Sequence, residues 1–152
     1  MTKDEYFMKK AILQATVAFK KDEVPIGCVI VKEGKIVARG YNTREKTQNA
    51  INHAEIIAIA RACKKLGSFR LEGCTLYVTA EPCAMCCGAI IQSRIERLVF
   101  GVYEEKFGCA VSQFQLLQKG KFNHYCEFEG GILEGECKKL LKDFFRDKRF
   151  RT

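Results

Sequence analysis

The feature that most constrains the fold of this chain is a split pair of segments, His53-x-Glu55 and Cys83-x-x-Cys86. One imidazole and two thiolates form a three-ligand set for zinc and leave the fourth tetrahedral position for water. His53 and Glu55 are two residues apart, so they can face one site only from the first turn of a helix. Cys83 and Cys86 are three apart and share a helix face, and Pro82 suits the first position of a helix. The segments therefore predict two helices whose N-termini converge on one metal ion.

Glu55 indicates that this metal site is catalytic. An open zinc site activates water near neutral pH, and a carboxylate beside it can move protons, which together indicate hydrolytic chemistry. Either segment alone is weak evidence, because a lone Cys-x-x-Cys also occurs in redox proteins and a lone His-x-Glu often lies on a surface helix. A structural zinc knuckle usually has a second Cys-x-x-Cys, which this sequence lacks. Together, the two segments predict a catalytic zinc site.

The remaining cysteines and the second histidine are expected to have structural roles. The nine cysteines are odd in number and irregularly spaced, which is not a disulfide framework. We expect most of them to be buried free thiols, with Cys87 packing away from the metal. His124 is expected to be a structural or loop histidine and not a further metal ligand.

Hydrophobic periodicity and turn residues predict alternating helices and strands. In chain order we expect a helix over 3–20, a hairpin over 27–41, a polar loop over 44–52, a helix over 54–66, a strand over 75–79, a helix over 82–93, a strand over 97–101, a short helix near 113–118, a strand over 125–128 and a helix over 133–149. This order predicts a single α/β domain over residues 1–152, with a mixed sheet and helices on both faces.

Composition and charge indicate the cellular compartment of the protein and the class of molecule that it binds. The start of the chain does not resemble a signal peptide, and no apolar run approaches the ~18 residues that a membrane span needs. We therefore expect a cytoplasmic protein with no membrane contact. The net charge is +8, and residues 138–152 alone carry seven Lys or Arg against two Asp, a local charge of +5. Such a basic terminal helix indicates a polyanionic partner such as nucleic acid, unless it is only a solvated charged face.

Over nearly its whole length the sequence resembles the bacterial tRNA-specific adenosine deaminases of the cytidine deaminase superfamily. The His-x-Glu and Pro-Cys-x-x-Cys segments are the signature that the whole superfamily of zinc nucleobase deaminases shares. Four other stretches match the tRNA branch: Glu-Val-Pro-Ile-Gly at 23–27, Gly-Tyr-Asn at 40–42, Ser-Arg-Ile at 93–95 and Phe-Phe-Arg at 144–146.

The resemblance implies a three-layer sandwich with a five-stranded mixed sheet, a homodimer and one zinc ion (Zn2+) per subunit. It also implies hydrolytic deamination of the wobble adenosine to inosine in a tRNA anticodon stem-loop, typically that of an arginine tRNA. By the same resemblance His53, Cys83 and Cys86 bind zinc, and Glu55 is the catalytic proton shuttle. The substrate contacts that it implies are Pro25, Ile26, Asn42, Ala80, Glu81, Phe145 and Arg149.

Two of these assignments have structural alternatives. Asn42 matches the residue that hydrogen-bonds the flipped base, but it also suits a turn after the hairpin. Phe145 and Arg149 suit RNA contact, because aromatic and cationic side chains stack bases and hold phosphates. The alternative is that the apolar residues of this helix form its buried face, and we favour that role for Leu140 and Leu141.

The sequence departs from the usual family pattern at Asn52, Ala80 and Glu104, where alanine, leucine and aspartate respectively are common. The first two changes touch no metal ligand. The third change, Glu104, lies in the loop after the strand over 97–101. It is expected to affect contacts with the nucleotides beside the target base.

Three other functions are compatible with parts of the sequence. A free-base or nucleoside deaminase acting on guanine or cytosine would share the zinc site, but it has no physical need for the basic terminal helix. A zinc-stabilised RNA-binding module without activity, and the inactive partner of a heterodimeric editor, are both disfavoured by Glu55.

Overall fold

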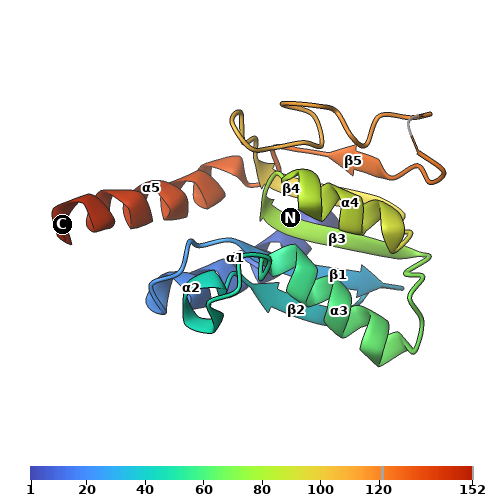
Figure 1. Cartoon of the computed structure of the whole chain (residues 1–152), viewed down its shortest axis with the longest axis horizontal. Helices are drawn as coiled ribbons and strands as arrows, with labels where there is room; N and C mark the ends of the chain where they lie inside the picture. Colours follow the sequence, from blue (N-terminus) through green and yellow to red (C-terminus); the bar gives the residue numbers. More distant parts are fainter. Residues whose placement is uncertain (121, 152) are drawn as a thin grey trace.

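A five-stranded mixed sheet forms the middle layer of the molecule (Figure 1). The computed structural model describes the backbone of residues 1–120 and 122–151 and, within this range, the side chains as far as residue 148. The strands are β1 (Gly27–Lys32), β2 (Lys35–Tyr41), β3 (Cys74–Ala80), β4 (Arg97–Val102) and β5 (Glu127–Glu129). Their order is β2-β1-β3-β4-β5, with β1 antiparallel to both neighbours and β3, β4 and β5 parallel. The predicted five-stranded mixed sheet is confirmed.

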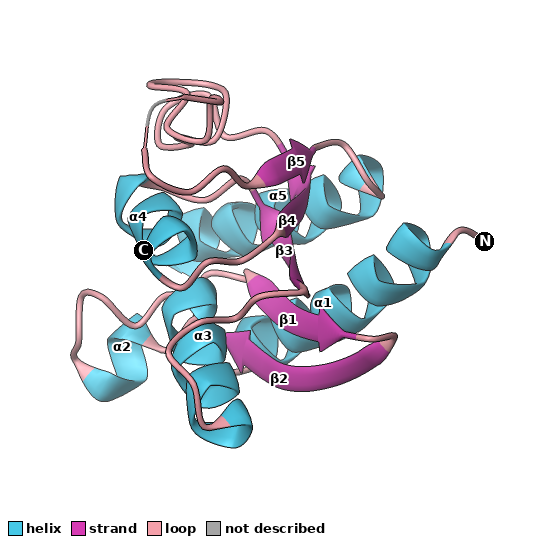
Figure 2. Cartoon of the chain, turned by 90° about the vertical axis from the view of Figure 1, so that its right-hand side faces the viewer, coloured by secondary structure: helices cyan, strands magenta, loops and turns pink. Residues whose placement is uncertain are grey.

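Helices cover both faces of this sheet, as predicted, and Figure 2 shows α3 and α4 on the opposite side of the strands from α1. The elements are α1 (Lys3–Lys20), α2 (Arg44–Thr47), α3 (Ala54–Leu66), α4 (Ala84–Gln92) and α5 (Glu134–Arg151). Helices α1 and α5 contact one face, and α3 and α4 share the other. Within the described residues, no helix is both long and apolar enough to cross a bilayer.

The inner strands are apolar on both sides because each side faces a different core. On β1, Cys28 and Ile30 belong to the core under α3 and α4, whereas Val29 and Val31 belong to the core under α1 and α5. This explains the unbroken apolar run of β1, since a strand covered on both faces shows no polar alternation.

A glycine lets α3 lie close against β2. A Cβ on Gly40 would lie 2.5 Å from the carbonyl oxygen of Ala54 and 3.0 Å from the amide nitrogen of Ala58. Ala54 and Ala58 are fully buried, so small side chains on the helix complete the close approach. Gly40 thereby fixes the position of the first turn of α3 against the sheet.

Four sequence predictions differ from the structure. Helix α4 begins at Ala84, because Cys83 has an extended backbone (φ −74°, ψ 178°) and is the N-cap. The predicted loop over 44–52 contains α2, which at four residues is too short to show a periodicity. Strand β5 begins at Glu127, two residues later than expected.

The predicted helix near 113–118 is absent from the described residues of this segment, which form turns. The reason is visible in its backbone hydrogen bonds. The N–H of Gln113 donates to Gly108 O at 2.9 Å, and that of Leu116 donates to Cys109 O at 2.8 Å. These partners do not follow the i to i−4 spacing of an α-helix.

Candidate metal centre and substrate cleft

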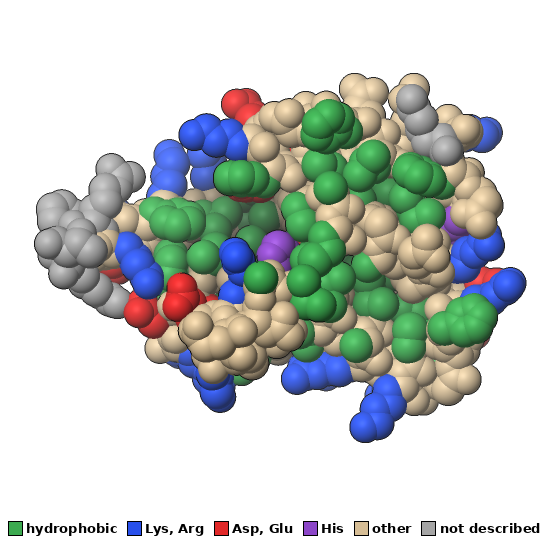
Figure 3. Space-filling view, in the orientation of Figure 1, with side chains coloured by type: hydrophobic (Ala, Val, Ile, Leu, Met, Phe, Trp, Pro, Cys, Tyr) green, Lys and Arg blue, Asp and Glu red, His purple; other side chains and the backbone are tan. Residues whose placement is uncertain are grey.

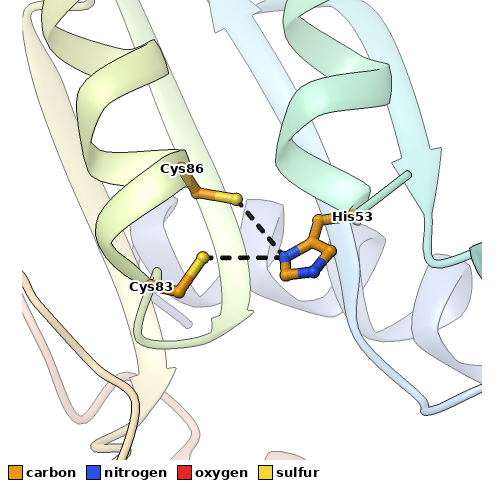
Figure 4. Close-up of side chains that lie close together, drawn as sticks. All are labelled: His53, Cys83 and Cys86. Carbon is orange, nitrogen blue, oxygen red and sulfur yellow. Dashed lines mark hydrogen bonds between the residues drawn. The ribbon is translucent and has the colours of Figure 1, made fainter. Parts of the chain in front are cut away.

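Two adjacent helix N-termini bring together the three predicted zinc ligands (Figure 4). His53 is the N-cap of α3, Cys83 is the N-cap of α4 and Cys86 lies in the first turn of α4. Nδ1 of His53 lies 3.7 Å from Sγ of Cys83 and 3.6 Å from Sγ of Cys86, and the ligand atoms all lie within 4.8 Å of one another. The convergence of two helix starts, which the residue spacing predicted, is thus observed.

The donor set fits zinc. Tetrahedral zinc with Zn–S of about 2.3 Å and Zn–N of about 2.0 Å separates a nitrogen ligand from a sulfur ligand by about 3.5 Å. The two nitrogen–sulfur distances in the structure are close to this value. Among the residues that the structure describes, no other group of His, Cys, Asp and Glu has this arrangement.

Without the metal ion, the electrostatics of the ligands concentrate the negative charge on one thiolate, that of Cys83. The thiol of Cys86 hydrogen-bonds Cys83 and lowers the pKa of Cys83 to about 4, and the neighbouring His53 acts in the same direction. The same hydrogen bond and burial raise the pKa of Cys86 well above its ordinary value. The thiolate of Cys83 in turn raises the pKa of His53. The partial positive charge of two helix N-termini adds to this preference for a thiolate.

Glu55 lies beside the ligands in a buried position. It is the second residue of α3, and its side chain is only 4% exposed. Burial raises its pKa to about 7, against the smaller opposing effects of its own backbone N–H and of His53. A carboxyl group with a pKa near neutrality can both accept and return a proton, which suits general acid–base catalysis.

A cleft of about 1330 Å³ opens outward from the metal centre. In Figure 3 it is the hollow between α5, at the left, and the body of the molecule. The predicted site residues that line it are Ile26, Asn42, His53, Glu55, Ala80, Glu81, Cys83 and Phe145. Pro25 is buried and is not among the lining residues, and the side chain of Arg149 lies outside the described residues.

Asn42 makes hydrogen bonds that stabilise the turn after the hairpin, which is its alternative structural role. Its Oδ1 accepts a hydrogen bond from the backbone N–H of Arg44 at 3.1 Å, and its Nδ2 donates to Val24 O at 3.4 Å. Its place in the cleft keeps it within reach of a substrate, so the predicted contact with a base stays a prediction.

Two adjacent aromatic residues of helix α5 have different environments, one in the core and one in the cleft. Phe144 is buried, with its ring 5.9 Å from that of Phe19, whereas Phe145 is 47% exposed and lines the cleft. Leu140 and Leu141 are half-buried. The cations of α5 that line the cleft are Lys138, Lys139, Lys142 and Arg146.

Two buried glutamates hold segments that border the cleft, and neither was predicted from the sequence as a loop anchor. The carboxylate of Glu23 accepts hydrogen bonds from α2, and that of Glu81 accepts them from residues 104–112. A signal was present, because each glutamate lies next to a buried strand, where a charged group needs hydrogen-bond partners.

The other residues singled out in the sequence have structural contacts. Nε2 of His124 donates to the carbonyl oxygen of Ile95 at 2.7 Å. Cys87 is buried, and all nine cysteines are free. Asn52 donates to Thr47 Oγ1 at 2.9 Å and so ties α2 to the start of α3.

Comparison with known proteins agrees with this geometry. The model of the MafB19-like deaminase family matches residues 1–149. A tRNA-specific adenosine deaminase of Bacillus subtilis (strain 168) is 52% identical over 149 residues, which cover 98% of this chain and 92% of that protein. A structure solved in a study of A-to-I editing by tRNA:A34 deaminases at the wobble position of transfer RNA matches with a TM-score of 0.86 and 39% identity, over 90% of this chain and 99% of that one. A guanine deaminase from Nitrosomonas europaea shares the fold, with a TM-score of 0.81 and 24% identity over 92% of this chain and 83% of that one.

Proposed function

This chain belongs to the tRNA-specific adenosine deaminases within the MafB19-like deaminase family, and from this membership we propose that it hydrolyses the wobble adenosine of a tRNA anticodon loop to inosine. The observation that carries the proposal is the meeting of His53, Cys83, Cys86 and Glu55 at the inner end of a cleft whose outer side is the basic helix α5. We extend the proposal to an arginine tRNA as the preferred substrate, and to the cytoplasm as the place of action.

The reaction follows from the chemistry of these groups. Zinc held by three protein ligands supplies Lewis acidity and activates water at neutral pH. Glu55 accepts one proton of the attacking water and delivers it to the ring nitrogen, where it stays in the product. Glu55 then transfers the second proton of that water to the amine, which leaves as ammonia. Carbon 6 of the adenine gains oxygen and loses ammonia. Burial raises the pKa of Glu55 above its ordinary value, and the positive charge of zinc, when bound, would favour the carboxylate that accepts the proton.

The cleft favours RNA over a free base. Its volume of about 1330 Å³ exceeds the several hundred Å³ that suffice for a small ligand. Lysines and an arginine of α5 line it together with the exposed ring of Phe145. Cations that hold phosphates and aromatic rings that stack unpaired bases are the usual means of binding a single-stranded loop.

We also propose a homodimer, with the second copy seated on the outer surface of α3 and α4. Several small or apolar side chains of these helices are exposed or half-buried: Ile56, Ala60, Ala84, Met85 and Ala89. Figure 3 shows a band of hydrophobic side chains on this face. A second copy would cover this surface beside the metal centre, because α3 and α4 begin there.

Deamination assays test the proposed function. The zinc-loaded protein is incubated with an arginine anticodon stem-loop that has adenosine at the wobble position, and in parallel with free adenosine, cytidine, cytosine and guanine. We expect inosine in the RNA alone. A stem-loop with the adenosine moved by one position, and stem-loops of other anticodons that begin with adenosine, measure the preference for position and for arginine tRNA. The variant Glu55→Ala is the catalytic control.

Two results would contradict the proposal. Turnover of a free base or nucleoside with the RNA untouched would assign the chain to another branch of the superfamily. Undiminished activity of Glu55→Ala on RNA would exclude the proton-transfer role of this residue.

A further inference from the structure

We propose that Glu23 and Glu81 are positioning residues that hold the two walls of the cleft and thereby set which nucleotides are accepted beside the target base. The first wall is the segment 42–47, of which Asn42 and Arg44 line the cleft, and the second is the segment 103–112, of which residues 103–107 line it. The inference rests on the proposed function for its substrate, an RNA loop. The geometry on which it is built is independent of that substrate.

Glu81 holds the second wall through both of its carboxylate oxygens. Oε1 accepts hydrogen bonds from Glu104 N at 3.0 Å and from the hydroxyl of Ser112 at 2.6 Å. Oε2 accepts from Val111 N at 2.8 Å and from Ser112 N at 2.9 Å. The side chain is 4% exposed, and a Cβ on Gly108 would overlap its carboxyl group, so the loop closes tightly around it.

Glu23 holds the first wall in the same way. Its carboxylate accepts hydrogen bonds from Glu45 N at 3.0 Å and from Lys46 N at 2.7 Å, and its side chain is 2% exposed. These are backbone groups of the single helical turn α2, next to Arg44, which lines the cleft.

Buried side chains hold only part of each wall, Cys109 and Ala110 in the second and Asn42 in the first, and most residues that face the cleft beside them are exposed. Phe107 of the second wall lines the cleft and is 69% exposed, and Lys106 and Arg44 also face it. Without the two carboxylates, the part-buried N–H groups that donate to them would lose their partners, and each lost hydrogen bond costs on the order of 1 kcal/mol. When a wall is already ordered, RNA binding does not have to order it, and the entropic cost of binding is smaller.

The effect of each glutamate should be confined to its own wall. Glu23 lies before β1 and Glu81 follows β3, so they reach the cleft from different strands. The first wall is bonded next to His53, through Thr43 N to Asn52 O at 3.1 Å. The second is bonded next to Cys83, through Cys109 N to Pro82 O at 2.8 Å. The two walls would therefore contact different neighbours of the target nucleotide. Loss of one anchor should therefore relax selectivity at one neighbouring position and leave the other unchanged.

The test compares Glu81→Gln with Glu23→Gln, each the matched control of the other. Glutamine keeps the size of the side chain but turns an NH₂ group toward N–H donors. Amide hydrogen exchange of the zinc-loaded protein is measured by mass spectrometry in residues 42–47 and 103–112. The kcat and KM values are measured on anticodon stem-loops that vary the nucleotide on either side of the target.

We expect Glu81→Gln to speed exchange in residues 103–112 by about tenfold or more, and Glu23→Gln to do so in 42–47, which corresponds to the loss of one or two hydrogen bonds. Each variant should retain one zinc per subunit, raise KM several-fold with kcat within about twofold, and flatten the preference on one side of the target. Gly108→Ala, which pushes a methyl group against Glu81, should reproduce Glu81→Gln, and Ser112→Ala should show a smaller effect in the same direction.

Unchanged exchange in both walls, a fall in kcat with KM unchanged, or loss of zinc from the variants would overturn the proposal. The last result would mean that Glu81 supports the neighbouring Cys83 and not the wall. If the wild-type protein fails to deaminate any stem-loop, the proposed function fails. The exchange measurements still decide whether the two glutamates hold the walls.

Discussion

At the scale of single residues, Glu55 shows how burial, as the largest effect, prepares a side chain for proton transfer. Its position in the first turn of α3 places it beside the metal ligands, and the loss of water around it raises its pKa to about 7. Without the metal ion, the folded protein therefore stabilises the neutral acid more than the unfolded chain does.

This shift predicts how the stability of metal-free protein depends on pH. A folded pKa above the ordinary value of 4.5 means that the folded state keeps a proton that the unfolded state releases, so Glu55 lowers stability progressively as pH rises from about 4 to about 7. Glutamine does not ionise. The variant Glu55→Gln should match the wild type at pH 4 and exceed its unfolding free energy by roughly 3 kcal/mol at pH 8.

Urea denaturation of chelator-treated protein at both pH values measures this difference. The comparison between variant and wild type cancels the titration of groups remote from Glu55, and the difference that remains includes its coupling to His53 and Cys86. A difference that stays constant between pH 4 and pH 8 would show that Glu55 is not responsible. Zinc-loaded protein serves as the control and should show a smaller change, because the charge of the ion favours the carboxylate.

At the scale of elements, the contact between β2 and α3 couples stability to metal binding. In Gly40→Ala the new methyl group would meet the carbonyl oxygen of Ala54 and push α3 away from the sheet. We expect a loss of about 1–3 kcal/mol of stability and weaker zinc binding, because His53 is the N-cap of the displaced helix. Thermal unfolding and zinc competition with a chelator measure the two effects.

Gly135→Ala is the matched control for this variant. Gly135 lies in α5, and a Cβ there would meet nothing within 4 Å. Alanine should be neutral or slightly stabilising at that position. If Gly40→Ala behaved like this control, the close approach of β2 and α3 would not determine the position of the zinc ligand.

The sequence could predict what depends on local chemistry. Helix α3 was predicted at its observed bounds, because its apolar stripe is periodic and Gly67 ends it with a left-handed backbone. The metal ligands were predicted because their spacing and their position at helix starts are local properties. Helix α2 and the turns near 113–118 were not predicted. Helix α2 is held by the distant Glu23, and the turns are held by irregular hydrogen bonds to Gly108 and Cys109 that no simple periodicity shows.

At the scale of the whole molecule, the basic charge on α5 should make RNA binding depend on salt. Contacts with phosphates release counterions, so the logarithm of affinity falls linearly with the logarithm of salt concentration. We expect Lys142→Ala, which removes a cation that lines the cleft, to reduce that slope by about 0.7. Fluorescence anisotropy with a labelled stem-loop measures it.

Lys9→Ala is the control, because Lys9 is an exposed cation of α1 and does not line the cleft. It removes the same charge from the protein and should leave the slope nearly unchanged. If the affinity of the wild type for the stem-loop did not depend on salt, the cations of α5 would be solvated and would not contact phosphates.

The proposed dimer is also a property of the whole molecule. Ala60→Arg would bury a charge in the surface formed by α3 and α4, and we expect this variant to be monomeric in analytical ultracentrifugation. Leu13→Arg places the same side chain on α1, at a residue that is 57% exposed, and should leave the dimer intact. A wild type that sediments as a monomer at micromolar concentration would contradict the dimer.

The way in which Glu23 and Glu81 hold the cleft walls has a consequence for how this family can diversify. Apart from the hydroxyl of Ser112, both carboxylates bind main-chain groups, which every residue except proline supplies. The backbone conformation of each wall therefore depends little on which side chains the wall presents to the RNA. Substitution at Glu104 or Phe107 would change the surface that meets the RNA and leave the hydrogen bonds of the wall in place.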